Sequence, residues 1–294
     1  LGGNTAASNN TAVGFDALLA NTTGNSNVAV GTESLKNNTT GAGVTAVGRD
    51  ALKANTTANF NDAFGYHALE VNTTGTRNVA LGSLSLDANT TANDNTAVGY
   101  AALTENTTGS NNVAVGANAL DACTVGSSHT AVGKDALGSV TNGNFNIGIG
   151  QSAGGSITTG DSNTAVGQEA LKNTTTADQN TAVGRHALEE NTTGLRNTAV
   201  GNEALEANTT ASNNTAIGNL ALTSNTTGAE NVAVGALSLN ANTSGSTNTG
   251  IGRFALGKNT TADSNTAVGH NCLKENTTGA GNTAVGETAL DAVT

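Results

Sequence analysis

Hydrophobic and polar residues recur along the chain with a period of 17 residues. Counted from its first Asn, the repeat reads N-T-A-V-G-x-x-A-L-x-x-N-T-T-G-x-x, and its positions are called columns 1 to 17 below. The glycine of column 5 recurs from Gly14 to Gly286 without one insertion or deletion. Loops tolerate changes in length at little cost. The constant period therefore indicates that each repeat stacks in register on the next, as in a solenoid.

Columns 1 to 5 have the pattern of a short strand. Column 4 is always Val, Ile, Leu or Phe, as in Val13, Phe64 and Ile149, and column 2 is Thr, Val or Ile except at Asp62. Thr and Val favour strands, the glycines and the Asn-Thr-Thr-Gly segment supply turns, and a helix so rich in Gly, Asn and Thr would be unstable. We therefore predict an all-β fold, a parallel β-solenoid (β-roll) of about seventeen 17-residue coils.

The array is expected to form one continuous domain over 1–294, with irregular coils at 116–160. In that stretch three apolar residues replace the asparagine of column 12, and Gly154 replaces the leucine of column 9. We expect it to be either a weak joint or a change in coil shape. Because the chain opens without Met and stops within a repeat, we also expect it to be a segment of a longer protein.

Charged residues are sorted by column. The chain has 11 basic and 22 acidic residues, and all but Asp62 lie in columns 6, 7, 10, 11, 16 and 17, which we interpret as the solvated surface. The formal net charge of −11 argues against nucleic acid and against an anionic membrane as partners. No apolar run reaches the roughly 18 residues that cross a bilayer.

The constant columns predict the core. Column 9 is almost always Leu, and columns 1 and 12 are mostly Asn, whose stacked side chains can form hydrogen-bonded ladders. We expect the Val of column 4, the Leu of column 9 and two Ala per coil to be buried. This burial and the hydrogen bonds of the coil together only roughly offset the entropy lost on ordering it. The small face of columns 3 and 5 suits the close approach of another backbone. We therefore expect two or three chains to pack side by side, with a single-chain solenoid that has Ala and Gly inside as the alternative.

The repeats resemble two related groups of proteins. The segments 26–31 and 112–116 are similar to the N-S-V-A-I-G repeat of YadA-like trimeric autotransporter adhesin heads. The full NTAVGxxALxxNTTG unit resembles arrays in tail-fibre-like proteins of phages and bacteria. The resemblance implies a left-handed β-roll, assembled as a homotrimer in an extracellular appendage or a virion fibre.

The cysteines and histidines do not suggest a site. Cys123 and Cys272 lie 149 residues apart, so they cannot pair within one chain of a solenoid, and we interpret them as small buried thiols, with an interchain disulfide as the alternative. His67 and His186 share column 7 but are seven coils apart, and His129 replaces a ladder Asn. We expect no two histidines to bind one metal.

Two groups of carboxylates are weak candidates for a calcium site. The first is a stack in column 7 of three successive coils: Asp16, Glu33 and Asp50. The second is a patch further along the chain: Glu189, Glu190, Glu203 and Glu206. Neither has the spacing of a calcium loop, and Lys36 and Lys53 in column 10 are expected to offset part of the first charge. We therefore favour solvated faces and predict no metal and no cofactor.

No catalytic motif is evident. The irregular stretch holds Asp121, His129, Lys134 and Asp135, the one place where divergent repeats could converge on a site, but no nucleophile, base and orienting group have a recognisable spacing. We predict that the protein is not an enzyme.

Twelve repeats match the acceptor motif for N-glycosylation at column 12. The candidate residues are Asn21, Asn38, Asn55, Asn72, Asn89, Asn106, Asn191, Asn208, Asn225, Asn242, Asn259 and Asn276. The hydrogen-bonded ladder competes with this interpretation, because a stacked Asn is inaccessible, and we favour the ladder.

The most favoured function is a structural and adhesive fibre shaft that associates with itself and touches host-surface glycans through its variable columns. The alternatives are a ligand- or ice-binding solenoid, which the regular Thr columns favour, and the stalk of a glycan-degrading tailspike. The latter would need clustered carboxylates across a groove, and the sequence shows none.

Overall fold

A computed structural model describes residues 3–291, which form a β-solenoid with seventeen strands and no helix. Each strand is three residues long and occupies columns 2 to 4. The strands are β1 (Thr11–Val13), β2 (Val28–Val30), β3 (Thr45–Val47), β4 (Asp62–Phe64), β5 (Val79–Leu81), β6 (Thr96–Val98), β7 (Val113–Val115), β8 (Thr130–Val132), β9 (Ile147–Ile149), β10 (Thr164–Val166), β11 (Thr181–Val183), β12 (Thr198–Val200), β13 (Thr215–Ile217), β14 (Val232–Val234), β15 (Thr249–Ile251), β16 (Thr266–Val268) and β17 (Thr283–Val285). The predicted parallel β-solenoid is confirmed.

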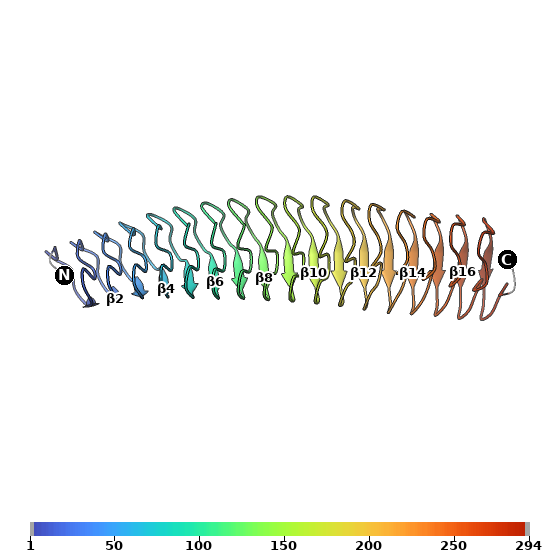
Figure 1. The fold of residues 1–294 in the computed structure, drawn as a ribbon, viewed down its shortest axis with the longest axis horizontal. Coiled ribbons are helices and arrows are strands. Elements are labelled where there is room, and N and C mark those ends of the chain that lie inside the picture. The colour runs from blue at the N-terminus through green and yellow to red at the C-terminus, as the bar shows by residue number, and fades with distance from the viewer. Residues whose placement is uncertain (1–2, 292–294) are drawn as a thin grey trace. The chain divides into compact units, whose positions relative to one another are not determined.

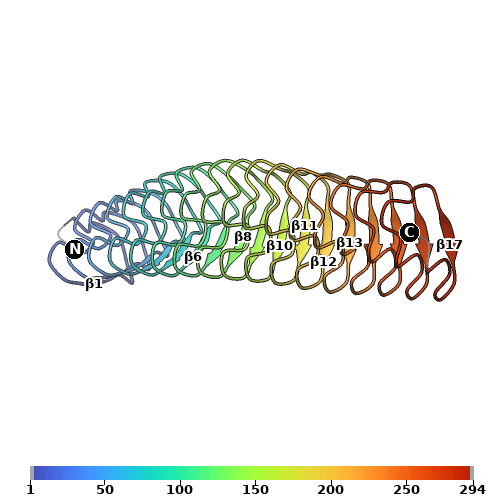
Figure 2. The same cartoon turned by 45° about the vertical axis from the view of Figure 1, so that its right-hand side comes forward.

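The chain divides into two compact units, Leu1–Phe145 with β1 to β8 and Asn146–Thr294 with β9 to β17. The boundary falls inside the irregular stretch 116–160. Within each unit the strands line one side of the stack, and the turns that complete the coils line the other (Figures 1 and 2). The coils of the irregular stretch keep strands of the same length and columns as the rest.

Equivalent residues lie against one another in successive coils. Strands β1 and β2 pair in parallel with Ala12 opposite Ala29, a shift of one repeat, and β10 and β11 pair in the same register. Hydrogen bonds between coils continue outside the strands. Leu35, for example, donates its backbone N–H to Ala51 at 2.9 Å. Because the backbone ladder extends around the turns as well, an insertion anywhere in a coil would break it, which explains the constant period.

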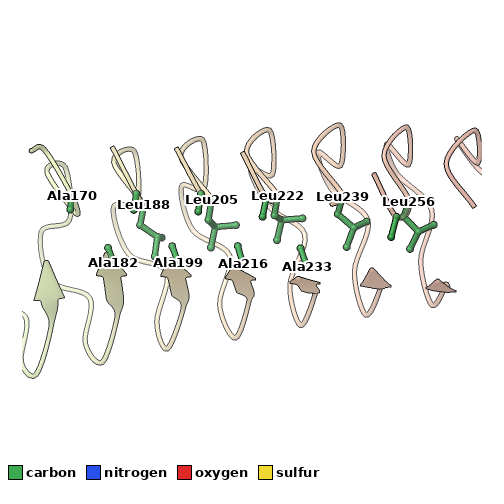
Figure 3. Packing of buried hydrophobic residues seen from close by; sticks show 14 of the residues in the cluster. Ala170, Ala182, Leu188, Ala199, Leu205, Ala216, Leu222, Ala233, Leu239 and Leu256 are labelled. Atoms are coloured by element: carbon green, nitrogen blue, oxygen red, sulfur yellow. The ribbon is translucent and has the colours of Figure 1, made fainter. Parts of the chain in front are cut away.

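The core is built from small residues of the strand and leucines of the opposite wall. Alanines of column 3 point inward from the strands, and the leucines of column 9 lie against them, as Ala182 and Leu188 do in the second unit (Figure 3). Both side chains are fully buried. The predicted burial of column 9 is therefore confirmed.

The predicted orientation of the strand is wrong, because column 3 faces the interior of the coil and column 4 faces outward. The residues of column 4 point out of the coil, and Leu81 is 48% exposed, Ile217 41% and Ile251 40%. The coil is narrow, and leucines and asparagines already fill it, so only Ala or Gly fits on the inner side of the strand. Columns 3 and 5 thus face the chain's own interior and its next coil rather than another chain. The interior of each coil therefore holds Ala and Gly, as the single-chain alternative expected, and the number of chains stays a prediction.

The glycine of column 5 is required by coil stacking. Gly99 has a φ of +136°, and a Cβ placed on it would lie 2.5 Å from the carbonyl oxygen of Gly116 in the next coil. Both conditions exclude a side chain. The close backbone approach that the sequence suggested therefore occurs between successive coils of one chain.

Candidate functional sites

The asparagines of column 12 form the predicted ladder. Asn38 Nδ2 donates to Asn21 Oδ1 of the preceding coil at 2.9 Å and to the carbonyl oxygen of Gly41 in its own coil at 3.0 Å. All twelve asparagines predicted as glycosylation acceptors stand in this column and have no exposed surface. Six belong to each unit, because Cys123, Val140, Ile157 and Thr174 interrupt the column. At the interruption, Oδ1 of Asn106 is buried without a hydrogen-bond partner.

The asparagines of column 1 form a second ladder. Asn27 Nδ2 donates to Gly41 O at 2.8 Å, and Asn27 Oδ1 accepts the backbone N–H of Val44 at 2.9 Å. Two asparagines, Asn27 and Asn38, thus converge on the carbonyl of Gly41. His129 takes the place of an Asn here, with Nε2 2.7 Å from Gly143 O, so its role is structural.

The acceptor motifs for glycosylation are therefore folded into the core. A glycan needs the amide nitrogen of Asn, and in the folded coil that nitrogen is buried and donates hydrogen bonds. The threonines of column 13 are also engaged, since Thr39 Oγ1 donates to Thr56 O of the next coil at 3.0 Å. Glycosylation stays a prediction, and it would have to precede folding at these asparagines.

Both thiols are buried, as predicted. Cys123 replaces a ladder Asn and places Sγ 3.5 Å from Gly126 O, and Cys272 replaces a column 8 Ala with Sγ 3.3 Å from Ala284 O. Neither has exposed surface, and both are free. Burial raises the pKa of the Cys123 thiol to about 11 and also raises the pKa of Cys272. In this state neither sulfur is placed to react or to pair with another chain.

Two lysines offset part of the charge of the first carboxylate stack. Lys36 Nζ lies 3.0 Å from Asp16 and 2.8 Å from Glu33, and Lys53 Nζ lies 2.6 Å from Glu33 and 3.1 Å from Asp50. Hydrogen bonds from the two lysines lower the pKa of Glu33 to about 2. The expected offset by these lysines is confirmed. Asp50 itself is 4% exposed, so column 7 is less solvated than predicted.

Two clusters combine a histidine with two carboxylates. In the first unit His67 Nδ1 lies 2.5 Å from Glu70 Oε2, with Asp87 on the next coil. In the second unit His186 Nδ1 contacts Glu189 and lies 3.7 Å from Glu169. In each cluster the three ligand atoms lie within 4.8 Å of one another. The prediction that no two histidines share a site did not foresee these clusters, which pair one His with carboxylates of its own and adjacent coils.

These clusters recur with the same charges in the same columns, seven coils or 119 residues apart. The five corresponding pairs are Asp50 and Glu169, Lys53 and Lys172, His67 and His186, Glu70 and Glu189, Asp87 and Glu206. This spacing is the sequence signal that could have found them. One imidazole and two carboxylates could hold a divalent metal. In the second cluster Lys172 already lies 3.2 Å from Glu169 and 3.6 Å from Glu189, which offsets part of the charge of the two carboxylates.

The second acidic patch is also partly paired. Arg185 lies 3.5 Å from Glu203, and Asn173 donates to Glu190 at 3.1 Å. Burial and the neighbouring carboxylates raise the pKa of Glu206. The patch is therefore a set of surface contacts between coils.

The candidates of the irregular stretch do not converge. His129 points into the core, whereas Lys134 and Asp135 pair with each other at 3.2 Å on the surface. Burial raises the pKa of Asp121, which lies in column 10 of the preceding coil. No nucleophile and base come together among these four residues.

A hollow in the surface of the second unit was not foreseen. It is lined by Asn240, Ala241, Phe254, Gly257, Lys258 and Lys274, from three successive coils. Its volume is about 220 Å³. It exists because Gly257 occupies column 10, where most coils carry a longer side chain.

No protein family and no curated protein matches this sequence. Nor does the described part of the chain contain a helix of the length and hydrophobicity that a membrane span requires. What the chain does must therefore be argued from its own geometry.

Proposed function

We propose that this protein is the non-enzymatic shaft of an adhesive fibre on an extracellular appendage or a virion, built from several copies of the chain. The observation that carries the proposal is the sheet face, which consists of the outward side chains of columns 2 and 4. It presents a column of Val, Ile, Leu and Phe beside a column of Thr and Val along the strands of each unit.

An apolar strip of this kind is unusual on a chain that works alone. Soluble monomers rarely expose contiguous apolar patches of more than a few hundred Å². Here residues such as Leu81, Ile149 and Ile251, each at least 40% exposed, belong to one face of their unit. Packing of these faces against one another in a homotrimer would remove them from water, at a gain of about 25 cal/mol per Å².

The remaining architecture suits a passive shaft. Each coil contacts its neighbours through backbone hydrogen bonds, the leucine column and two Asn ladders, so that stiffness comes from stacking. Polar groups with the geometry of a catalytic site are absent from the candidate residues described above. The variable columns supply the outer surface that would touch host glycans.

The test compares the assembly of the chain with that of two matched variants. Ile217→Lys with Ile251→Lys places charges on the sheet face, whereas Thr227→Lys with Thr261→Lys places the same charges on exposed threonines of column 14. Native mass spectrometry should find more than one copy for the wild type and the threonine variant, and single chains for the isoleucine variant. Thin filaments are expected by negative-stain microscopy. A monomeric wild-type chain at micromolar concentration would contradict the proposal.

A further inference from the structure

The hollow around Gly257 brings together side chains from three successive coils of the second unit. Phe254 forms one wall from column 7, Lys274 lies below in the next coil, and Asn240 lies above in the preceding one. With its amide nitrogen turned toward the carbonyls, Asn240 donates to Leu237 O at 3.1 Å and to Gly257 O at 2.8 Å. Those bonds fix the side chain and leave its oxygen as an acceptor.

Positive charge gathers around this hollow in an otherwise acidic chain. Arg253 Cζ lies 4.6 Å and Lys274 Nζ 5.6 Å from the centre of the Phe254 ring, both within the range of cation–π contacts. Lys258 forms a third cation and pairs with Glu275 at 2.6 Å. Three of the 11 basic residues thus lie in or beside the hollow, and one carboxylate, Glu275, pairs with two of them, at 2.6 Å from Lys258 and 3.9 Å from Lys274.

The equivalent place in the first unit has the opposite charge. Seven coils earlier, Gly138 also occupies column 10, but Asp121 and Asp135 stand where Asn240 and Phe254 stand in the second unit. A Cβ on Gly138 would lie 3.3 Å from Asp121 Oδ1, so a carboxylate borders that position. The two units therefore share the glycine but differ in what surrounds it. The basic hollow therefore comes from the variable residues of its own three coils and not from the constant residues of the repeat.

We propose that the hollow binds an acidic sugar residue, a sialic or hexuronic acid, at the surface of the fibre. The inference rests on the proposed adhesive function and names its ligand class. Lys258 and Lys274 would receive the carboxylate, since charge-assisted hydrogen bonds are the stronger ones. The edge of the Phe254 ring would contact the apolar face of the sugar ring, and Asn240 would accept from a hydroxyl.

The size of the hollow limits the occupant to about one sugar ring. Sites for larger ligands have roughly 300–1,000 Å³, and this one has about 220 Å³. The site is open to solvent along the surface, so the rest of a polysaccharide chain could continue away from it. A ligand carboxylate would compete with Glu275 for both Lys258 and Lys274. Single sugars should therefore bind weakly, and several copies of the chain would strengthen binding.

Binding can be measured on the whole chain by calorimetry or by ligand-observed NMR. The acidic probes are sialyllactose and a hyaluronan tetrasaccharide, and their neutral counterparts are lactose and chitotetraose. We expect at least one acidic probe to bind and both neutral ones to bind about tenfold more weakly or not at all. Equal binding of acidic and neutral probes, or no binding of either acidic probe, would overturn the proposal. Inorganic phosphate that binds as tightly as the acidic probes would also overturn it, because the sugar ring would then contribute nothing.

The variants are chosen from residues that the same columns already accept. Lys274→Thr matches Thr104 and Thr223 of column 10, and Phe254→Asn matches Asn118 and Asn271 of column 7, which have the same positive φ. Each should weaken binding of the acidic probe about tenfold, whereas Lys36→Thr, the same change in the first unit, should not. Circular dichroism confirms that each variant is folded, and binding unchanged in both hollow variants would refute the assignment.

The number of chains is measured separately on the same samples. A single chain that binds the acidic probe retains the hollow and refutes the multi-chain shaft. An assembled fibre that binds neither acidic probe retains the multi-chain shaft and refutes the hollow as a sugar site.

Discussion

At the scale of single residues, the backbone is held in conformations that most side chains avoid. The leucines of column 9 have a φ near +50°, as in Leu35 and Leu52, in the left-handed region that costs a residue with a Cβ roughly 1–2 kcal/mol. They are also fully buried. Burial of the side chain and the surrounding hydrogen bonds must outweigh this strain in every coil, so the local conformation is imposed by stacking.

Removal of one ladder amide should destabilise the chain. Asn72 accepts from Asn89 Nδ2 at 2.8 Å and donates to Gly75 O at 2.9 Å, both within the core. Asn72→Ala leaves a buried donor with a poorer partner, so we expect a loss of about 1–3 kcal/mol in the free energy of unfolding. Urea denaturation followed by circular dichroism measures it. Thr74→Ala, on the exposed column 14, should change stability by less than about 0.5 kcal/mol.

A side chain in column 5 should be tolerated worst. Gly99→Ala combines a positive φ with a contact of 2.5 Å to the next coil's backbone, and we expect a loss of at least about 3 kcal/mol. The matched control is Gly281→Asn. Gly281 also has a positive φ, of +73°, but nothing lies within 4 Å of its Cβ position, and Asn111 and Asn213 occupy the same column. Equal thermal midpoints for the two variants would contradict this account.

The buried thiols should not react while the chain is folded. Burial raises the pKa of both, to about 11 for Cys123, so little thiolate exists near pH 8 and none is accessible. We expect no release of colour from Ellman's reagent by the native protein and two thiols per chain in denaturant. Reaction of a thiol in the absence of denaturant would show that a coil opens locally while the chain stays folded.

At the scale of elements, coils are joined by charges as well as by backbone. The zigzag of Lys36 and Lys53 between three carboxylates links three coils on the outer surface. Such pairs are exposed in part and screened by salt. They add an ionic link between successive coils to the backbone hydrogen bonds.

This zigzag should lose its effect in acid. The pKa of Glu33 is lowered from 4.5 to about 2 in the folded chain, so its contribution is complete above pH 4.5 and is lost as pH falls toward 2. We expect the thermal midpoint to fall over this range, and to fall less in Glu33→Gln. The control is Glu230→Gln, an exposed carboxylate of column 17, which should follow the wild type. If the thermal midpoint of Glu33→Gln fell with pH as steeply as that of the wild type, this role of Glu33 would be excluded.

The sequence predicted the coils, their register and both Asn ladders, because these follow from a constant period and from which columns are constant. It did not predict which side of the strand faces inward. Hydrophobicity favours Val over Ala for the interior, and only the narrow cross-section, seen once Leu205 and Asn208 are in place, reverses the choice. The His67 cluster and the hollow at Gly257 each combine residues of adjacent coils. They can therefore be found only by comparing columns between coils, and not by inspecting one repeat.

At the scale of the whole molecule, length should be adjustable only in steps of one coil. Deletion of 95–111 removes 17 residues and joins equivalent columns, so the ladders close again. Deletion of 95–110 leaves each column facing its neighbour and turns apolar side chains to the wrong side. We expect the first variant to keep the wild-type circular dichroism spectrum, with a thermal midpoint within a few degrees, and the second to lose both. Similar stability of the two would mean that stacking does not set the period.

The strict stacking of like on like has a consequence for heredity. Recombination between misaligned repeats of the gene adds or removes whole coils, and each product still matches at every join, so the lineage can lengthen or shorten without passing through unfolded intermediates. The correspondence between residues 50–87 and 169–206, seven whole coils apart, has the spacing that such an event would produce. A copied block would be free to acquire new surface residues while its interior stayed fixed, and the two units differ in this manner, since one carries a basic hollow where the other carries two aspartates.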